Sequence, residues 1–403
     1  MPEPVVGSVP RGEDYFGQEA LISEIWARLQ RGNVLLVAPR RFGKTAAMYR
    51  LLDDPQQGFR PLYVYVQPIS TPADFMIEIL AALLRDRHFS RVLGRVWEGT
   101  KGFGAWLRNL PENIDVGGIK VQLREATEVP AKWQEYGQRV MDGLAEEDPR
   151  LLLLIDEFAD MMNAMAQRNK EEAAQLLGWF RGARTAPATR TRFVISGSTN
   201  LITSLDALGL VDKINDLSVL RLKPFDHDVA IRYVRAVFQS KHVPLSPAVE
   251  TRIIQLLGAP VPYLLAVLLE AILERSRAKG GALDAELVES AFEEDLLGGG
   301  TSVTFLHYRS RLDRHYPGRE ADAARAILNL LSRADSAVTH DTLYQTYLRT
   351  RNVQPSPKSH EAFVRLMQKL ENDFYVVSAD SGFAFFSRVL HLWWKRDYGY
   401  QEG

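Results

Sequence analysis

An apolar run followed by a short arginine-rich loop constrains the fold of this chain more than any other feature. Residues 33–38 read NVLLVA, and residues 38–45 read APRRFGKT. The second segment matches the pattern G-x-x-x-x-G-K-[ST] at every position except the first, where Ala38 replaces glycine. Such a loop turns its backbone N–H groups inward, and the helix N-terminus behind it adds positive potential, so it binds phosphate. We therefore expect a strand, a phosphate-binding loop and a helix in this order.

The residues of this loop have separate expected roles. Gly43 lets the backbone approach a phosphate closely, Lys44 brings positive charge to the β- and γ-phosphates, and the Thr45 hydroxyl ligates Mg²⁺. A chance G-K-T in a solvated loop is the alternative, and the strand and helix on either side argue against it. The expected contacts of ATP and Mg²⁺ in this segment are Ala38, Pro39, Arg40, Arg41, Phe42, Gly43, Lys44, Thr45 and Ala46.

A second apolar run, residues 151–155, ends in two acids, Asp156 and Glu157. At the carboxyl edge of a parallel sheet, Asp156 can hold Mg²⁺ through water. Glu157 is then the natural general base for the attacking water. The alternative is that the acids only mark the end of a strand, but the phosphate-binding loop upstream favours the catalytic interpretation. Asp160 is a further acid that could lie near this pair, although a solvated loop position is the more common outcome for such a residue.

Small polar residues follow a third apolar run, residues 192–196. Ser198 is the first choice to contact the γ-phosphate or to orient water, ahead of Thr199 and Asn200. A capped turn stabilised by these same side chains explains them equally well.

Two arginines on the preceding helical stretch, Arg181 and Arg184, are candidate arginine fingers. A guanidinium group neutralises the charge that spreads over a transferring phosphoryl group. Arginines on helix surfaces are far more common than fingers, however, and a finger often comes from a neighbouring subunit.

The first half of the chain alternates between strand and helix patterns. Five apolar runs with little polar alternation predict buried parallel strands at 33–38, 61–66, 151–155, 192–196 and 217–222. Between them, helices are expected at 21–30, 45–52 and 72–87, where Thr71 caps and Pro72 begins the third. The alternation predicts a doubly wound α/β domain over residues 1–225.

The second half of the chain lacks this alternation. Four helices are expected at 228–240, 246–257, 261–279 and 284–297, which make a helical lid domain over 226–300. A basic helix at 302–316, with Arg309, Arg311 and Arg314, lies in a linker over 301–319. We expect it to present a solvated face, with phosphate sensing or DNA contact as the alternative.

The last segment, residues 320–403, predicts a winged-helix domain. Its pattern is helix, helix, helix, hairpin, helix, with helices at 321–333, 339–351 and 359–371 and strands at 374–378 and 383–387. Trp393 and Trp394 are expected in its core. The segment carries ten Lys/Arg and ten Asp/Glu, so support for DNA binding is weak. The cations concerned are Lys358, His360, Arg365, Lys369, Arg388, Lys395 and Arg396.

Composition excludes several other classes of protein. The 403 residues are 46% hydrophobic and 25% charged, an ordinary globular mix. A net charge of −1 gives no bulk attraction to nucleic acid or anionic membrane. The absence of cysteine excludes disulfides and thiolate metal sites. Neither a signal-peptide pattern nor an apolar stretch of about 20 residues is present, so we expect a soluble, cytoplasmic protein.

Together these motifs resemble the AAA+/STAND branch of the P-loop ATPases, in particular the archaeal-type ATPase group related to origin-recognition ATPases. That group carries A-P-R-R-x-G-K-T at its phosphate-binding loop, which accounts for Ala38. Residues 154–158 (LIDEF) are similar to its Walker B motif and 194–198 (VISGS) to its sensor strand. The resemblance implies a parallel sheet in the order 5-1-4-3-2.

The resemblance also implies further nucleotide contacts. Residues 14–19 (DYFGQE) are similar to the group's F-G-R-E box, which closes over adenine, so Phe16 and Gly17 are expected there. Gln18 replaces the arginine of that box. Residues 258–263 (GAPVPY) resemble a G-x-P-Y segment whose proline packs on the nucleotide, here Pro262, although simple helix initiation explains this proline too.

Three functions follow as hypotheses. The first is an ATP-hydrolysing switch, in which the nucleotide state moves the lid and the winged helix to control a protein partner or self-assembly. The second is an origin-recognition-like ATPase whose winged helix binds duplex DNA. The third is a scaffold that binds ATP without hydrolysing it.

Overall fold

The computed structural model describes residues 2–110, 115–125, 127–197, 201–298, 302–316 and 318–398. The chain divides into two compact units. The first, which we call the sheet unit, consists of Gln18–Ala38 and Lys44–Leu222. The second, the helical unit, consists of Met1–Gly17, Pro39–Gly43 and Lys223–Gly403. The middle of the phosphate-binding loop therefore belongs to the helical unit, whereas the strand before it and the helix after it belong to the sheet unit.

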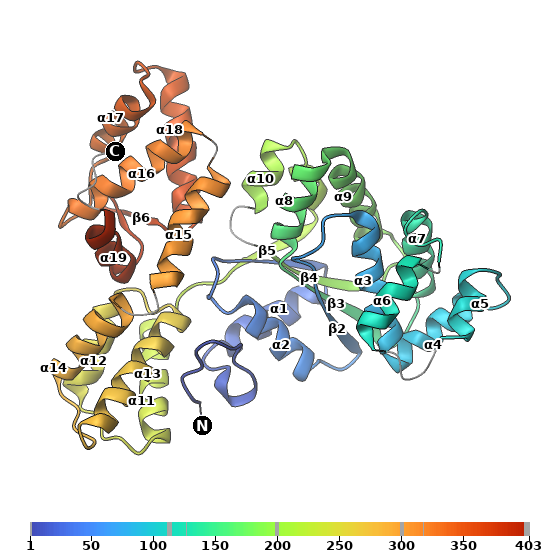
Figure 1. The fold of residues 1–403 in the computed structure, drawn as a ribbon, viewed down its shortest axis with the longest axis horizontal. Helices are drawn as coiled ribbons and strands as arrows, with labels where there is room; N and C mark the ends of the chain where they lie inside the picture. Colours follow the sequence, from blue (N-terminus) through green and yellow to red (C-terminus); the bar gives the residue numbers. More distant parts are fainter. Residues whose placement is uncertain are drawn as a thin grey trace. The chain divides into compact units, whose positions relative to one another are not determined.

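Among the described residues, the sheet unit holds a parallel sheet of five strands (Figure 1). They are β1 (Asn33–Val37), β2 (Phe59–Tyr65), β3 (Arg150–Asp156), β4 (Arg192–Gly197) and β5 (Leu217–Arg221). The order is β2-β3-β4-β1-β5, which confirms the predicted order 5-1-4-3-2. Every residue of β1 is buried, as expected for a strand covered on both faces.

Helices cover both faces of this sheet (Figure 1). Leu35 and Val37 of β1 join the large core under α3, α8 and α9, whereas Val34 and Leu36 point to the other face. The helical elements of the unit are α1 (Glu19–Leu29), α2 (Lys44–Asp53), α3 (Pro72–Arg85), α4 (Arg87–Val96), α5 (Phe103–Arg108), α6 (Val116–Glu125), α7 (Trp133–Gly143), α8 (Phe158–Arg168), α9 (Lys170–Thr185), α10 (Leu201–Ala207) and the short 3₁₀ turn η2 (Val211–Ile214).

The predicted helix 72–87 ends at Arg85, and a second helix, α4, which the sequence analysis does not predict, begins at Arg87. The side chain of Thr71 caps α3 by accepting from the N–H of Asp74 at 3.0 Å, as expected. The side chain of Asp86 then accepts from the N–H groups of His88 (2.9 Å) and Phe89 (3.1 Å), so it is the N-cap of α4. This cap ends one helix and starts the next within two residues.

The helical unit contains a lid region, residues 223–298, and a C-terminal region, residues 318–398. The lid helices are α11 (His227–Ser240), α12 (Pro247–Leu257), α13 (Pro262–Ala278), α14 (Ala285–Ser290) and the π-helical η3 (Ala291–Leu297). The C-terminal elements are α16 (Arg319–Arg333), α17 (His340–Arg351), α18 (Pro357–Asn372), β6 (Val376–Ala379), β7 (Gly382–Phe385) and α19 (Arg388–Tyr398). Strands β6 and β7 pair antiparallel, and the unit also has η1 (Gly12–Asp14) near the N-terminus. The element order matches the prediction for both regions.

Between them, α15 (Ser302–His315) packs against the C-terminal region. Arg311 is only 5% exposed and forms an ion pair with Asp373 at 3.3 Å, to which the Tyr316 hydroxyl also donates at 2.8 Å. The expectation of a solvated basic face is therefore wrong at Arg311, because the sequence does not reveal the buried carboxylate that pairs with it. Trp393 and Trp394 are fully buried, which confirms their predicted core position. None of the helices in the described part of the chain is long and apolar enough to cross a membrane.

Candidate nucleotide site

The predicted phosphate-binding loop connects β1 to α2. Strand β1 ends at Val37, and α2 begins at Lys44. Arg41 and Gly43 have positive φ angles of 70° and 93°, which turn the loop tightly. Lys44 is 6% exposed, and its Nζ donates to the carbonyl oxygen of Ala38 at 2.7 Å. The ammonium group thus lies at the start of the loop, where the sequence predicts phosphate.

The Asp156 carboxylate is the centre of a second set of hydrogen bonds in the candidate site. The described residues provide it with four hydrogen-bond donors. Oδ2 accepts from the hydroxyls of Thr45 (2.7 Å) and Tyr63 (2.9 Å). Oδ1 accepts from the hydroxyl of Ser196 and from the N–H of Glu157 (3.0 Å). The two predicted metal ligands, Thr45 and Asp156, are therefore in direct contact, although they lie far apart in the sequence.

These residues fit a magnesium ion bound together with a nucleotide. In such sites Mg²⁺ takes one or two protein oxygens, and phosphates and waters complete its shell. Thr45 and Asp156 offer a hydroxyl and a carboxylate of this kind. No group of three or more His, Cys, Asp or Glu within the described ranges could hold a metal alone.

Glu157 follows Asp156, a predicted metal ligand, in a left-handed conformation, with φ 61° and ψ 33°. A non-glycine residue held there costs about 1–3 kcal/mol, a strain typical of functional sites. Its N–H donates to Oδ1 of Asp156 and, at 2.9 Å, to the hydroxyl oxygen of Ser196. This conformation determines the direction in which the predicted general base leaves the sheet edge. Asp160, expected in a loop, lies instead in the first turn of α8 and accepts from Gln67 at 2.9 Å.

Ser196 is a site residue that sequence reasoning missed. It is fully buried on β4 beside Leu36 of β1, and its hydroxyl donates to Asp156. A single serine in an otherwise apolar strand was the available signal. The residue predicted for this role, Ser198, lies outside the described residues, as do Thr199 and Asn200.

Tyr63 is a second site residue without a sequence signal. It lies on β2, which pairs with β3, and its hydroxyl donates to Asp156. Burial and the negative charge of Asp156 raise the pKa of Tyr63, so the hydroxyl keeps its proton and remains a donor.

The two candidate arginine fingers lie near the amino ends of the strands, whereas the predicted nucleotide site lies at their carboxyl ends. The carbonyl oxygen of Arg184 accepts from the Asn33 side chain at 3.4 Å, and the same side chain accepts from the N–H of Phe193 at 3.0 Å. Asn33 and Phe193 lie where β1 and β4 begin, whereas Lys44 and Asp156 lie where strands end. Arg184 therefore does not reach a nucleotide bound at its own loop.

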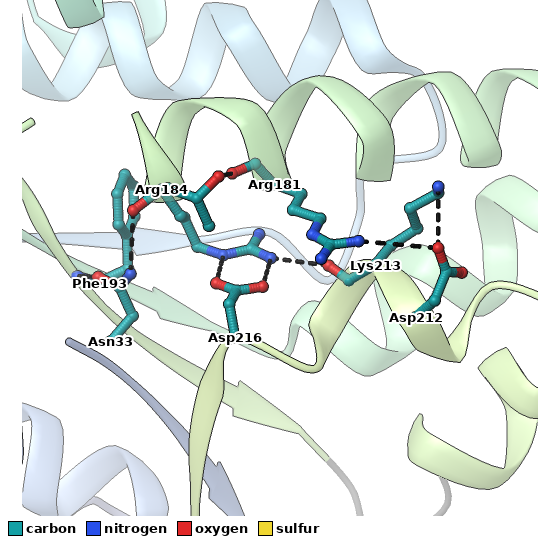
Figure 2. A network of polar contacts seen from close by, with 8 residues as sticks. Asn33, Arg181, Arg184, Phe193, Asp212, Lys213 and Asp216 are labelled. Atoms are coloured by element: carbon teal, nitrogen blue, oxygen red, sulfur yellow. Dashed lines mark hydrogen bonds and ion pairs between the residues drawn. The ribbon is translucent and has the colours of Figure 1, made fainter. Parts of the chain in front are cut away.

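The side chain of Arg184 also does not fit a finger acting on a neighbouring chain. Figure 2 shows its guanidinium facing Asp216, with Nε and one Nη at 3.0 Å and 2.9 Å from the two carboxylate oxygens. The same Nη donates to the carbonyl oxygen of Lys213 at 2.8 Å. The side chain is fully buried, so this contact is structural. Arg181 reaches Asp212 at 3.7 Å and is 37% exposed.

The remaining predicted nucleotide contacts belong to the helical unit. The Phe16 ring lies 5.4 Å from that of Tyr233 on α11. Gly17 has φ 72°, and a Cβ there would come within 2.4 Å of Val229, so only glycine fits this approach. Pro262 is the first residue of α13, which agrees with helix initiation.

The middle of the phosphate-binding loop packs on this same helical unit. The Arg41 guanidinium carbon lies 4.0 Å from the centre of the Tyr263 ring, next to Pro262. Phe42 is 1% exposed, and its ring lies 5.1 Å from Phe374 and 6.4 Å from Phe386. The loop therefore touches both the lid region and the C-terminal region.

The five-stranded parallel sheet, the loop after β1 and the Asp-Glu pair at the end of β3 are features of the P-loop ATPase fold. The sequence matches no protein-family model and no curated protein. The structure is similar to a Walker-type ATPase of Pyrococcus abyssi, with a TM-score of 0.62, 16% identity, and coverage of 96% of this chain and 98% of that one. It is also similar to the ORC2 protein of Aeropyrum pernix in its ADPNP-ADP complexes, with a TM-score of 0.54, 16% identity, and coverage of 96% and 93%. The chain thus has the fold of an archaeal group of AAA+ ATPases related to origin-recognition proteins.

Proposed function

We propose that this protein is an ATP-hydrolysing switch whose nucleotide state repositions its lid region and its winged helix, the C-terminal region, to control a protein partner. The observation that carries this proposal is the packing of the phosphate-binding loop. Arg41 lies on Tyr263 of the lid region, and Phe42 lies against Phe374 and Phe386 of the C-terminal region. A change in the conformation of the loop would therefore alter contacts in both regions.

The binding step uses the residues of the loop itself. Lys44, which donates to the Ala38 carbonyl, is the cation available to the phosphates. Thr45 and Asp156 would hold Mg²⁺, which neutralises charge on the phosphate oxygens. We expect bound phosphate to reorient backbone N–H groups of the loop, which would change the dihedral angles at Arg41 and Phe42.

The hydrolytic step is assigned to Glu157 as the general base that orients and deprotonates the attacking water. Ser196 supports Glu157 in this role, because its hydroxyl accepts from the Glu157 N–H and donates to the Asp156 carboxylate. Arg181, the more exposed of the two arginines, remains the candidate finger for a neighbouring copy of the chain.

The coupling step has a clear energetic basis. Truncation of a buried phenylalanine to alanine costs about 3–5 kcal/mol in protein cores. Nucleotide binding that removes Phe42 from its contacts must supply a comparable free energy. The loss of these contacts therefore couples the conformation of the loop to the position of the C-terminal region. A ligand shifts a conformational equilibrium only by its difference in affinity for the two states.

Phe42→Ala tests this coupling. In the wild type we expect ATP to increase amide hydrogen exchange in residues 372–387, because the loop withdraws its ring. In the variant, exchange there should be high with or without ATP, since the contact is already lost. Val353→Ala, a truncation of an apolar side chain that is 41% exposed in the same C-terminal region, is the matched control and should behave as wild type. An ATP-dependent change of wild-type size in Phe42→Ala would contradict the proposal.

Duplex DNA as the partner remains the alternative. Several cations of the C-terminal region form ion pairs with acids. The ammonium nitrogen of Lys369 lies 2.8 Å from a carboxylate oxygen of Glu320, and that of Lys395 lies 3.7 Å from one of Asp335. The guanidinium group of Arg365 pairs with Glu361. Neutralised cations release few counterions on DNA, so these pairs favour a protein partner. A salt-dependent gel shift that Arg365→Ala and Lys369→Ala weaken would support DNA. Absence of a shift at low salt would remove this alternative.

A further inference from the structure

We infer that Tyr63 is a positioning residue for the metal-binding carboxylate of Asp156 and thereby sets the affinity of the site for Mg²⁺. This inference rests on the proposed nucleotide site and adds a residue that lies outside its motifs. The Tyr63 hydroxyl donates to Oδ2 of Asp156 at 2.9 Å, the same oxygen that accepts from Thr45.

The strand register puts Tyr63 in place. On the paired strands β2 and β3, Tyr65 is the partner of Asp156. Tyr63 is two positions earlier on β2, so its side chain leaves the sheet on the same face as the side chain of Tyr65. A long phenol side chain then spans the distance to the neighbouring strand end, which a shorter hydroxyl side chain on β2 would not.

The carboxylate of Asp156 is held from both of its neighbouring strands. Tyr63 donates from β2 to Oδ2, and Ser196 donates from β4 to Oδ1. Thr45 donates to Oδ2 from α2, but the Thr45 oxygen is itself a proposed ligand of the metal. If the Tyr63 hydroxyl is removed, Thr45 is the only other donor to Oδ2 among the described residues, and its oxygen would also have to bind Mg²⁺.

Tyr63 is in turn held by Tyr49 of α2. The two rings lie 4.9 Å apart at an angle of 54°. Such aromatic pairs contribute about 0.5–1.5 kcal/mol beyond the area that they bury. Tyr49 lies one helical turn after Thr45, so the same helix positions the threonine and the ring that supports Tyr63. The phenol is therefore fixed before any metal arrives.

Groups that orient a metal ligand usually change metal affinity by about 10–100-fold when they are removed. Tyr63→Phe keeps the ring and its packing against the Tyr49 ring but removes the hydroxyl that donates to Asp156. We expect the Mg²⁺ concentration at half-maximal tightening of ADP binding to rise roughly tenfold. The affinity for ADP in EDTA should stay within about twofold of wild type, because the phosphate contacts of the loop are intact.

The experiment is a calorimetric titration of ADP into the full chain at a series of Mg²⁺ concentrations and in EDTA. Tyr65→Phe is the matched control, because it lies on the same strand, is 45% exposed, and has its hydroxyl against Gln67. A wild-type Mg²⁺ midpoint in Tyr63→Phe would overturn the inference. So would an equal loss of affinity with and without Mg²⁺, which indicates a purely structural role. Failure of the wild type to bind ADP at any Mg²⁺ concentration would instead refute the proposed function.

Discussion

Glu157→Gln should bind ATP with wild-type affinity and hydrolyse it about 10²–10⁴-fold more slowly, the range that general base catalysis typically contributes. Glutamine keeps the size of the side chain and its hydrogen-bonding capacity but cannot accept the proton of the attacking water. The backbone conformation at this position depends on the N–H contacts to Asp156 and Ser196, which the substitution leaves in place. Phosphate release and the equilibrium binding of ATP, measured on the same preparation, separate the two effects.

Lys44→Ala is the companion variant. It removes the ammonium group from the loop and should abolish ATP binding, so that turnover is lost for a different reason. Equal turnover in the wild type and both variants would refute the ATPase assignment. Tight ATP binding by the wild type without phosphate release would favour a nucleotide-binding scaffold.

Arg184→Ala should lower the free energy of unfolding by about 3–5 kcal/mol, the usual cost of breaking a buried ion pair from one side. The side chain is fully buried, and Asp216 would be left without the two hydrogen bonds that it now accepts from the guanidinium group. The loss would weaken the anchoring of α9 to the segment that leads into β5. Urea unfolding followed by far-ultraviolet circular dichroism measures it.

Two further variants distinguish a structural arginine from a finger. Arg181→Ala, on the same helix but with a side chain that is 37% exposed, should change stability by no more than about 0.5 kcal/mol. Replacement of the buried pair by apolar residues, Arg184→Met with Asp216→Leu, should recover most of the stability, because such exchanges are often neutral or stabilising. A hundredfold loss of turnover in Arg184→Ala at unchanged stability would contradict the structural role.

The strands and the loop are largely predictable from the sequence because their signals are local. An apolar run of five or six residues and a G-K-T motif identify β1, the loop and α2 without knowledge of any partner. The helices between β2 and β3 are harder. There a single side chain, Asp86, decides whether one helix continues or two form, and its capping contacts depend on the folded backbone.

The candidate site divides in the same way. Lys44, Thr45, Asp156 and Glu157 follow from their motifs, and the structure brings Thr45 into contact with Asp156. Tyr63 lies in no motif, and the sensor-strand motif around Ser196 points to Ser198 instead, because the contacts of both residues with Asp156 arise only when neighbouring strands align in register. Arg184 has the residue type of a finger, but its function depends on Asp216, which no sequence pattern connects to it.

By itself, the sequence determined the class of fold and the position of the predicted phosphate-binding loop, since hydrophobic periodicity and short motifs act over neighbouring residues. Only the tertiary structure decided which hydroxyls surround Asp156, which arginine is buried, and that Phe42 joins the loop to Phe374 and Phe386. These outcomes depend on contacts between residues distant in the chain. Their free energy comes from burial and from polar partners that approach one another only after folding.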